Sequence, residues 1–402
     1  MSTGLEPVVF DAFAPEHRAD PYPRYARVRE AVPFLDSGFG VEFVTRHAEC
    51  SQILSETRWS HQDEATLFHP EADRLNLPTS FLWMDPPDHT RLRGLVSKAF
   101  TPKRVLDLVP RITELATGMI DAALDAGEVE AIEAIAYPLP LIVVCELVGV
   151  PPEDWPMVHR VGPGLARGFD PDRVLSPAER QARDDNTLEL VAYFRDLITK
   201  RLADPRNDVV SALGQVHEQG DTLTEHEMLT TCITLLIAGH ETTVNMVGNG
   251  LLAFARHPEQ LAEIRRRPEL AAPAVDEILR YDSAVHMTTR TARTDLVVGD
   301  RTFAEGESVC VLVGSANRDP RAFDRPDEFD VTRYASTAPT PRHLGFALGI
   351  HYCMGAALAR LEGEILWVEL ARRTRTLELA GDPVYRPNLL IRGLKELPLR
   401  IS

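Results

Sequence analysis

A cysteine near the C-terminal end of the chain lies in a setting that favours metal binding or nucleophilic attack. Cys353 follows a turn containing Gly349 and comes just before an expected helix. Unpaired backbone N–H groups and the positive end of a helix dipole stabilise the thiolate, the form of cysteine that ligates metals and attacks electrophiles. Gly349 and Gly355 let the backbone come close to a flat, bulky group. On these residues alone, a buried structural cysteine is an equal alternative.

A second candidate group interrupts the apolar stretch over residues 225–256, in the run Ala238-Gly239-His240-Glu241-Thr242-Thr243. Glycine and paired threonines lower helix propensity, so we expect a compensating role. A threonine hydroxyl can bond the carbonyl one turn back and open a local groove that admits water. Glu241 and Thr242 then offer an acid and an alcohol that can relay protons. The alternative is a packing defect on a buried helix.

Two further pairs of charged residues are spaced one helical turn apart. Glu277 and Arg280 lie on one helix face, where the alternative is a surface ion pair worth a few tenths of a kcal/mol. His89 and Arg93 also share a face and can clasp one anionic group through charge-assisted hydrogen bonds. The alternative for that pair is a solvated basic face.

Together these patterns resemble the cytochrome P450 superfamily, the haem-thiolate monooxygenases. The family's haem loop, FGxGxHxCxG, is matched except that Ala347 replaces the second-position glycine; the matching residues are Phe346, Gly349, His351, Cys353 and Gly355. The family's (A/G)Gx(D/E)T(T/S) pattern matches residues 238–243, and its DPPxHxxxR pattern matches residues 85–93. The motifs occur in the expected order from residue 85 to residue 355.

The resemblance implies roles for these residues. Cys353 is the axial ligand of the iron of haem b, which is iron protoporphyrin IX, and Thr242 and Glu241 serve oxygen binding and proton delivery. Further haem contacts come from Phe346, Gly355 and Ala238, and the propionates are bound by His89, Arg93, Arg290 and His351. Strand alternation favours Arg290 over its neighbour Arg293. Glu277, Arg280 and Arg333 form a structural group beneath the haem.

The resemblance also implies an apolar substrate chamber, although each of its residues could equally be ordinary packing. The expected substrate contacts are Trp83, Met84, Leu235, Gly239, Val285, His286, Met287 and Ile391, with Thr288 as a possible polar contact.

The elements that must position these groups are mostly helical. Proline positions, capping and apolar periodicity predict helices over residues 23–32, 104–126, 135–148, 178–203, 225–256 and 258–281. Two more helices are predicted, one that begins with Asp85 as its N-cap and one that follows Cys353. Alternation predicts a smaller β part around 30–46, 284–314 and 376–402. We therefore expect a mainly α fold with a minor β part. The resemblance makes it a single domain over residues 1–402, a helical prism with haem between a long distal helix and the cysteine-bearing proximal helix.

Composition restricts the remaining possibilities. The 60 acidic and 43 basic residues give a net charge of −17, which argues against a nucleic-acid partner. The five cysteines are scattered and include no CxxC pair, which favours a reducing cytoplasm. The start of the chain does not resemble a signal peptide, and the apolar runs are too short to span a bilayer. We expect a soluble cytoplasmic protein without a membrane partner.

The function implied by the resemblance is a bacterial-type monooxygenase. It is expected to activate O₂ with two electrons from NAD(P)H, delivered by a ferredoxin and a ferredoxin reductase, and to hydroxylate or epoxidise a secondary metabolite as a monomer. This is oxidoreduction on paired donors with one oxygen atom incorporated. One alternative is oxidative coupling on the same fold, and another is a non-catalytic haem-binding partner protein. The intact Glu241–Thr242 pair and cysteine loop weigh against the second.

Overall fold

The computed structural model describes residues 14–37, 41–62, 80–216, 222–337 and 339–402. The chain forms two compact units. The first comprises residues 1–59, 110–137 and 242–402, and the second comprises residues 60–109 and 138–241.

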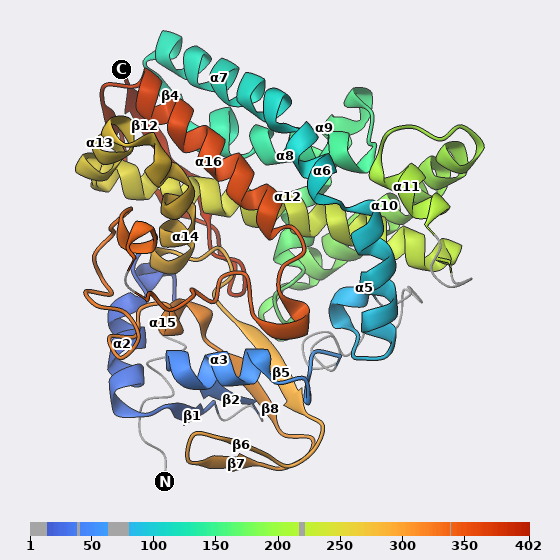
Figure 1. Ribbon diagram of the computed structural model, residues 1–402, viewed down its shortest axis with the longest axis vertical. Helices are drawn as coiled ribbons and strands as arrows, with labels where there is room; N and C mark the ends of the chain where they lie inside the picture. The colour runs from blue at the N-terminus through green and yellow to red at the C-terminus, as the bar shows by residue number, and fades with distance from the viewer. Residues whose placement is uncertain (1–13, 38–40, 63–79, 217–221, 338) are drawn as a thin grey trace. The chain divides into compact units, whose positions relative to one another are not determined.

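The first unit contains a five-stranded sheet that is covered by a short helix. The strand order is β1-β2-β8-β5-β3, and β2 runs parallel to β8 while β5 runs antiparallel to it. Helix α3 (His47–Ser55) buries Cys50, Ile53 and Leu54 against the sheet, at the i, i+3, i+4 spacing of one helix face (Figure 1). The strands are β1 (Phe34–Asp36), β2 (Val41–Val44), β3 (Trp59–Ser60), β5 (Thr288–Ala292) and β8 (Ser308–Val311).

The helices of the same unit include α12 and α16, which meet at a buried tryptophan. The indole of Trp367 on α16 is fully buried and meets Phe254 at a ring-centroid distance of 5.2 Å. A Cβ at Gly250 would lie 2.6 Å from the Trp367 ring, so only glycine permits this approach. The helices are α2 (Tyr22–Ala31), α7 (Val109–Ala126), the second half of α12 (Glu225–Arg256), α13 (Pro258–Arg266), α14 (Ala271–Tyr281), α15 (Val313–Ala316) and α16 (Ala356–Arg373).

Three small sheets complete the first unit. One has the order β4-β12-β9, and the other two are the hairpins β6–β7 and β10–β11. The strands are β4 (Glu128–Glu130), β6 (Leu296–Val298), β7 (Arg301–Phe303), β9 (Leu377–Leu379), β10 (Val384–Tyr385), β11 (Leu394–Glu396) and β12 (Pro398–Ile401).

Apart from the single strand residue Ser60, the regular secondary structure among the described residues of the second unit is helical. Helix α10 packs on α9 and α11, and a capping box of Ser176 and Glu179 fixes its start. Arg201 at its other end binds Asp208 at 2.6 Å and the carbonyl of Gly149 at 2.8 Å. The helices are α5 (Asp88–Ala99), α6 (Pro102–Asp107), α8 (Pro138–Val148), α9 (Trp155–Arg167), α10 (Pro177–Ala203), α11 (Val209–Gln215) and the first half of α12.

The predicted fold class is confirmed, and several helix boundaries are not. The segment 104–126 is divided at Leu108 into α6 and α7, and the segment 258–281 is divided at Arg267 into α13, a 3-10 turn and α14. The prediction of Asp85 as an N-cap is wrong, because α5 begins at Asp88 after Pro87. The Asp85 carboxylate instead accepts hydrogen bonds from Ser60 Oγ at 2.5 Å and His61 N at 3.1 Å. Among the described residues, no helix is long and apolar enough to cross a bilayer.

Glu362 on α16 gives the first unit a pH-dependent stability. Its side chain is 1% exposed, and Oε2 has no hydrogen-bond partner among the described residues. Burial raises the pKa of Glu362 from 4.5 to about 8. The folded chain therefore holds a proton that the unfolded chain releases, and this group lowers the free energy of unfolding as the pH rises from about 4.5 to about 8.

We predict that Glu362→Gln matches the wild type near pH 4.5 and becomes more stable towards pH 8, by no more than about 5 kcal/mol, because glutamine never ionises. Urea unfolding followed by circular dichroism at a series of pH values measures this difference. Glu364→Gln, which changes an exposed residue on the same helix, is the matched control. Equal pH dependence in the two variants would contradict the assignment.

Candidate functional site

The loop that carries Cys353 is closed on itself by a backbone hydrogen bond. Cys353 N donates to the carbonyl of Phe346 at 2.9 Å, and α16 begins three residues later with Gly355 as its N-cap. Gly349 has a φ of +66° and Ala347 a φ of +54°. A Cβ at Gly355 would lie 3.9 Å from Cys353 Sγ, so the glycine keeps the space beside the sulfur open.

Cys353 differs from the other four cysteines. All five lie in the described residues, none forms a disulfide, and only Cys353 is half-buried. Burial raises the pKa of the Cys145 thiol to about 12, and it raises those of Cys50 and Cys232 as well. Those three sulfurs are therefore held as inert thiols, whereas Cys353 lies at a helix N-terminus that favours a thiolate.

One face of α12 carries the predicted oxygen-binding motif. Leu235, Ala238, Gly239 and Thr242, spaced by three and four residues, are half-buried, whereas Leu236, His240, Glu241 and Thr243 are buried. His240 Nδ1 lies 3.8 Å from Glu241 Oε1. A Cβ at Gly239 would lie 3.1 Å from the Val144 side chain of α8, which leaves little room for a larger residue.

The structure brings Glu277, Arg280 and Arg333 together in the first unit. Arg280 Nε and Nη2 bind the Glu277 carboxylate at 2.7 and 2.8 Å, and Arg333 Nε binds the same group at 3.1 and 3.2 Å. Arg280 also donates to the carbonyls of Asn317 and Pro326. Glu277 is a buried carboxylate, so loss of either arginine would leave an uncompensated buried charge and destabilise the fold. The group therefore fixes the segment 317–333 onto α14.

The predicted propionate ligands occupy ordered positions on separate units. On α5, His89 is 2% exposed, and burial followed by the charge of Arg93 lowers the pKa of its imidazole. On β5, Arg290 is 3% exposed and donates to Thr288 Oγ1 at 3.0 Å and to the Thr289 carbonyl at 2.6 Å. Arg293 lies just beyond the strand and is exposed.

Comparison with known proteins identifies the family. The cytochrome P450 family model matches residues 169–376. The 6-deoxyerythronolide B hydroxylase of Saccharopolyspora erythraea is 36% identical over 401 residues, covering 95% of this chain and 96% of that protein. The chain belongs to the cytochrome P450 family.

Other relatives agree with this assignment. The cytochrome P450 monooxygenase PikC of Streptomyces venezuelae is 37% identical over 414 residues, covering all of this chain and 96% of that protein. The crystal structure of ligand-free Mycobacterium smegmatis CYP164A2 superposes with a TM-score of 0.88 at 39% identity, covering 98% of this chain and 100% of that chain. The chain is thus an oxygen-inserting P450 enzyme of the bacterial type, and the family implies the use of haem and O₂.

The P450 cofactor fits the residues that the first unit presents. A single cysteine sulfur is the ligand that haem takes in P450 enzymes, and Cys353 is the one half-buried cysteine of the described residues. Gly355 leaves the sulfur accessible, and the buried Arg290 offers a cation for an anionic substituent. His351 ends the short 3-10 turn over Gly349–His351, two residues before the sulfur.

The predicted substrate contacts are only partly brought together. Val285 and Ile391 pair directly in an isolated antiparallel bridge, and Met287 follows at 6% exposure. In the second unit, Trp83 closes the 3-10 turn over Phe81–Trp83 before Met84, and its ring lies 4.7 Å from that of His61. The resemblance also implies that the loop over residues 59–84 lines the chamber, and its residues 63–79 lie outside the described residues.

His286 has contacts that account for it without a substrate. Its imidazole is 2% exposed and lies 3.3 Å from the Tyr25 hydroxyl, 3.5 Å from the Tyr22 hydroxyl and 3.8 Å from Asp282. Burial lowers the pKa of His286 to about 4. Asp282 in turn binds Arg392 at 2.7 Å. We therefore place His286 in this buried polar cluster and leave it out of the chamber. No sequence motif indicated the cluster, because its members are far apart in the chain.

Ala347 stands where the P450 haem loop usually has glycine, in a backbone conformation that favours glycine. An L-residue in the left-handed region raises the free energy of the folded state by about 1–2 kcal/mol, and glycine removes this cost. Glycine also raises the conformational entropy of the unfolded chain, which offsets part of the gain in stability. We predict that Ala347→Gly raises the free energy of unfolding by about 0.5–1 kcal/mol, measured by urea unfolding.

The matched control for this substitution is Ala122→Gly, at an exposed position within α7. There glycine should lower stability by about 1 kcal/mol, because the backbone is right-handed helix. A loss of stability in Ala347→Gly of the same size would show that the loop does not hold residue 347 in the left-handed region.

Proposed function

We propose that this P450 enzyme holds haem through Cys353 and hydroxylates a medium-to-large natural product. The observation that carries the proposal is the half-buried Cys353, in a closed loop at the start of α16, within a chain of the P450 family. When bound, the haem supplies the oxygen-activating chemistry, which uses O₂ and two electrons. The protein supplies the ligand, the orientation of the substrate and the path of the protons.

Charged side chains of α5 and of β5 are suited to bind the haem propionates. His89 and Arg93 are one turn apart on α5, and Arg290 is buried on β5. Propionates are carboxylates, so charge-assisted hydrogen bonds from these side chains would orient the ring. Phe346, Ala238, His351 and Gly355 complete the proposed cofactor contacts.

Thr242 and Glu241 form the proposed proton relay. Thr242 lies on the half-buried face of α12, and Glu241 is buried beside it in the chain. A hydroxyl on the open face can hold a water molecule, and a carboxyl group next to it can supply that water with a proton. Proton delivery by this route would need both groups, the hydroxyl of Thr242 to hold the water and the carboxyl of Glu241 to protonate it.

The substrate class rests on the relatives and on the lining residues. The relatives include a hydroxylase of 6-deoxyerythronolide B, a vitamin D(3) 25-hydroxylase and a protein of polyketide biosynthesis. The proposed contacts are mainly apolar, which suits such a scaffold; they are Trp83, Met84, Leu235, Gly239, Val285, Met287 and Ile391.

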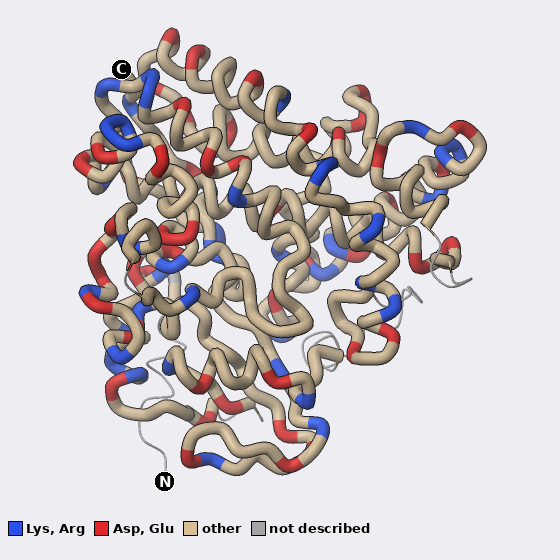
Figure 2. Tube along the Cα trace, viewed as in Figure 1, with Lys and Arg blue, Asp and Glu red and all other residues tan. Residues whose placement is uncertain are grey.

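We further propose a ferredoxin and its NAD(P)H-dependent reductase as the electron source, with the enzyme acting as a cytoplasmic monomer. An acidic ferredoxin needs a local basic surface, because the chain carries a net charge of −17. Acidic residues are spaced along the outer turns of α7, which makes that helix unfavourable for docking (Figure 2). We therefore propose an arginine-rich docking surface on the cysteine side of the protein; Arg342, eleven residues before Cys353 in the chain, is exposed.

The relay predicts a specific loss in Thr242→Ala. Without the hydroxyl, electrons should still be consumed, but they should be diverted to hydrogen peroxide. Product formed per NAD(P)H oxidised should therefore fall about tenfold or more. The test uses a ferredoxin, its reductase and the compound that gives the largest iron spin-state change when a library of macrolactones, sterols and fatty acids is titrated.

Thr243→Ala is the control, because Thr243 is the neighbouring hydroxyl on the buried side of α12. It should leave the product ratio near that of the wild type, and both variants should retain the spin-state response to substrate. An unchanged ratio in Thr242→Ala, or an equal fall in the two variants, would overturn the relay. A protein that gives no substrate-dependent oxidation with any compound would overturn the proposed hydroxylation.

A further inference from the structure

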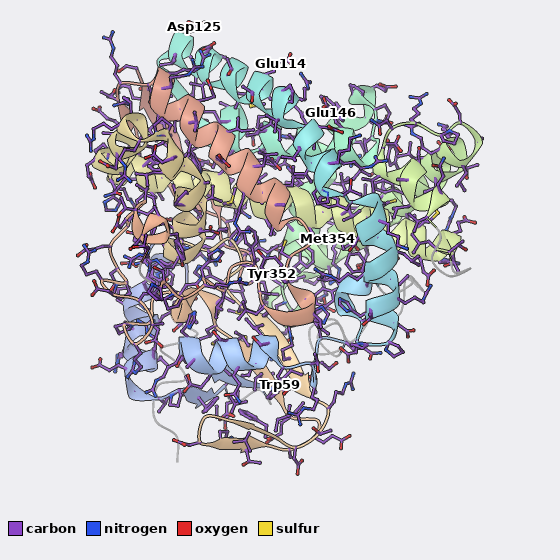
Figure 3. The ribbon with its side chains drawn as sticks, in the orientation of Figure 1. Trp59, Glu114, Asp125, Glu146, Tyr352 and Met354 are labelled. Atoms are coloured by element: carbon purple, nitrogen blue, oxygen red, sulfur yellow. The ribbon has the colours of Figure 1, made fainter. Side chains whose placement is uncertain are left out.

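The residue before Cys353 carries a hydroxyl that is held by an arginine of α16. Arg360 Nη1 donates to the Tyr352 hydroxyl at 2.9 Å. The other two nitrogens of the same guanidinium, Nε and Nη2, donate to Asp276 Oδ1 at 2.9 and 2.8 Å. Tyr352 and Met354, which flank Cys353, are labelled in Figure 3 beside the start of α16. One rigid, planar cation therefore connects the cysteine loop to α14.

Asp276 is itself firmly anchored. It directly precedes Glu277 on α14, and His343 Nε2 lies 2.9 Å from its Oδ1. Burial raises the pKa of Asp276, but the hydrogen bonds and charges of His343 and Arg360 outweigh that effect and hold it below its ordinary value. Asp276 is thus a carboxylate at neutral pH, and it orients the Arg360 fork.

The other end of the loop meets the same guanidinium. Arg360 lies over the Phe346 ring at 4.7 Å from its centroid, and the rings of Phe346 and Tyr352 are 6.3 Å apart. Phe346 and Tyr352 bracket the loop that the Cys353 N to Phe346 O hydrogen bond closes. Arg360 therefore contacts both ends of the loop. Cys353 lies between Tyr352, which Arg360 holds, and the start of α16.

We infer that Tyr352 is a positioning residue for Cys353. Its hydroxyl, held by the Asp276-anchored Arg360, keeps the cysteine loop closed, so that the sulfur stays in place to bind iron. The P450 loop pattern leaves this position unspecified, so the device comes from this chain's own tyrosine. The inference rests on the proposed role of Cys353 as the iron ligand.

The test compares Tyr352→Phe with the wild type as haem-loaded proteins. Phenylalanine keeps the ring and removes only the hydroxyl. In mild urea, we expect the thiolate-specific absorption of the reduced, carbon monoxide-bound form to be lost about tenfold faster in the variant, as expected for one hydrogen bond to a charged group. Labelling of Cys353 by a thiol reagent, followed by peptide mass spectrometry, should accelerate by the same factor.

The buried cysteines and a second tyrosine provide the controls. Labelling of Cys310, buried on β8 of the same unit, reports general unfolding and should not change. Tyr334→Phe is the matched substitution, because the Tyr334 ring packs 6.0 Å from His343 while its hydroxyl has no hydrogen-bond partner among the described residues. It should leave both rates at the wild-type values.

Arg360→Lys provides a second, independent variant. Lysine keeps the charge but cannot present the planar fork that binds Asp276 and Tyr352 together, so it should reproduce the acceleration seen in Tyr352→Phe. Equal rates in wild type and Tyr352→Phe, or equal acceleration of Cys310 labelling, would overturn the inference. If the wild type itself lacked the thiolate-specific absorption, the proposed role of Cys353 would fail instead.

Discussion

The closure of one short loop determines what this chain can do chemically. The hydrogen bond from Cys353 N to the Phe346 carbonyl makes a compact turn that leads directly into α16, so the sulfur lies at the positive end of a helix. The other four cysteines are buried. A sulfur that is accessible, held by its backbone and favoured as a thiolate is the property on which cofactor binding depends.

The support for that loop is a pair of carboxylates on α14, of which Glu277 is fully buried and Asp276 is half-buried. Glu277 holds Arg280 and Arg333, and Asp276, one residue earlier on α14, holds Arg360. A buried carboxylate such as Glu277 is expensive to bury alone, and it becomes stable because several donors converge on it. Donors also converge on the half-buried Asp276, which binds Arg360 and His343. Two adjacent residues of α14 therefore hold two different segments. Glu277 holds the segment around residue 330, and Asp276 holds the cysteine loop through Arg360.

Local patterns predicted the motif-bearing elements well. Apart from the Glu277–Arg333 contact, which the family resemblance implied, contacts between distant segments could not be predicted. The helix over 225–256 and the strands within 284–314 were predicted because their apolar periodicity is strong. The helices α3, α9 and α11 were missed because two of them are short and Pro163 interrupts the pattern of α9. Asp85 resembled an N-cap, but a tertiary contact with Ser60 uses its carboxylate. The contacts of His286 and Arg360 join segments far apart in the sequence, which no local spacing reveals.

The most direct test of the account is the absorption spectrum of the reduced, carbon monoxide-treated protein beside that of Cys353→Ser. The account predicts the long-wavelength band of thiolate-ligated haem in the wild type and its absence in the variant, with Cys310→Ser behaving as the wild type. A wild type without that band, or a Cys353→Ser variant that retains it, would show that Cys353 does not hold the iron.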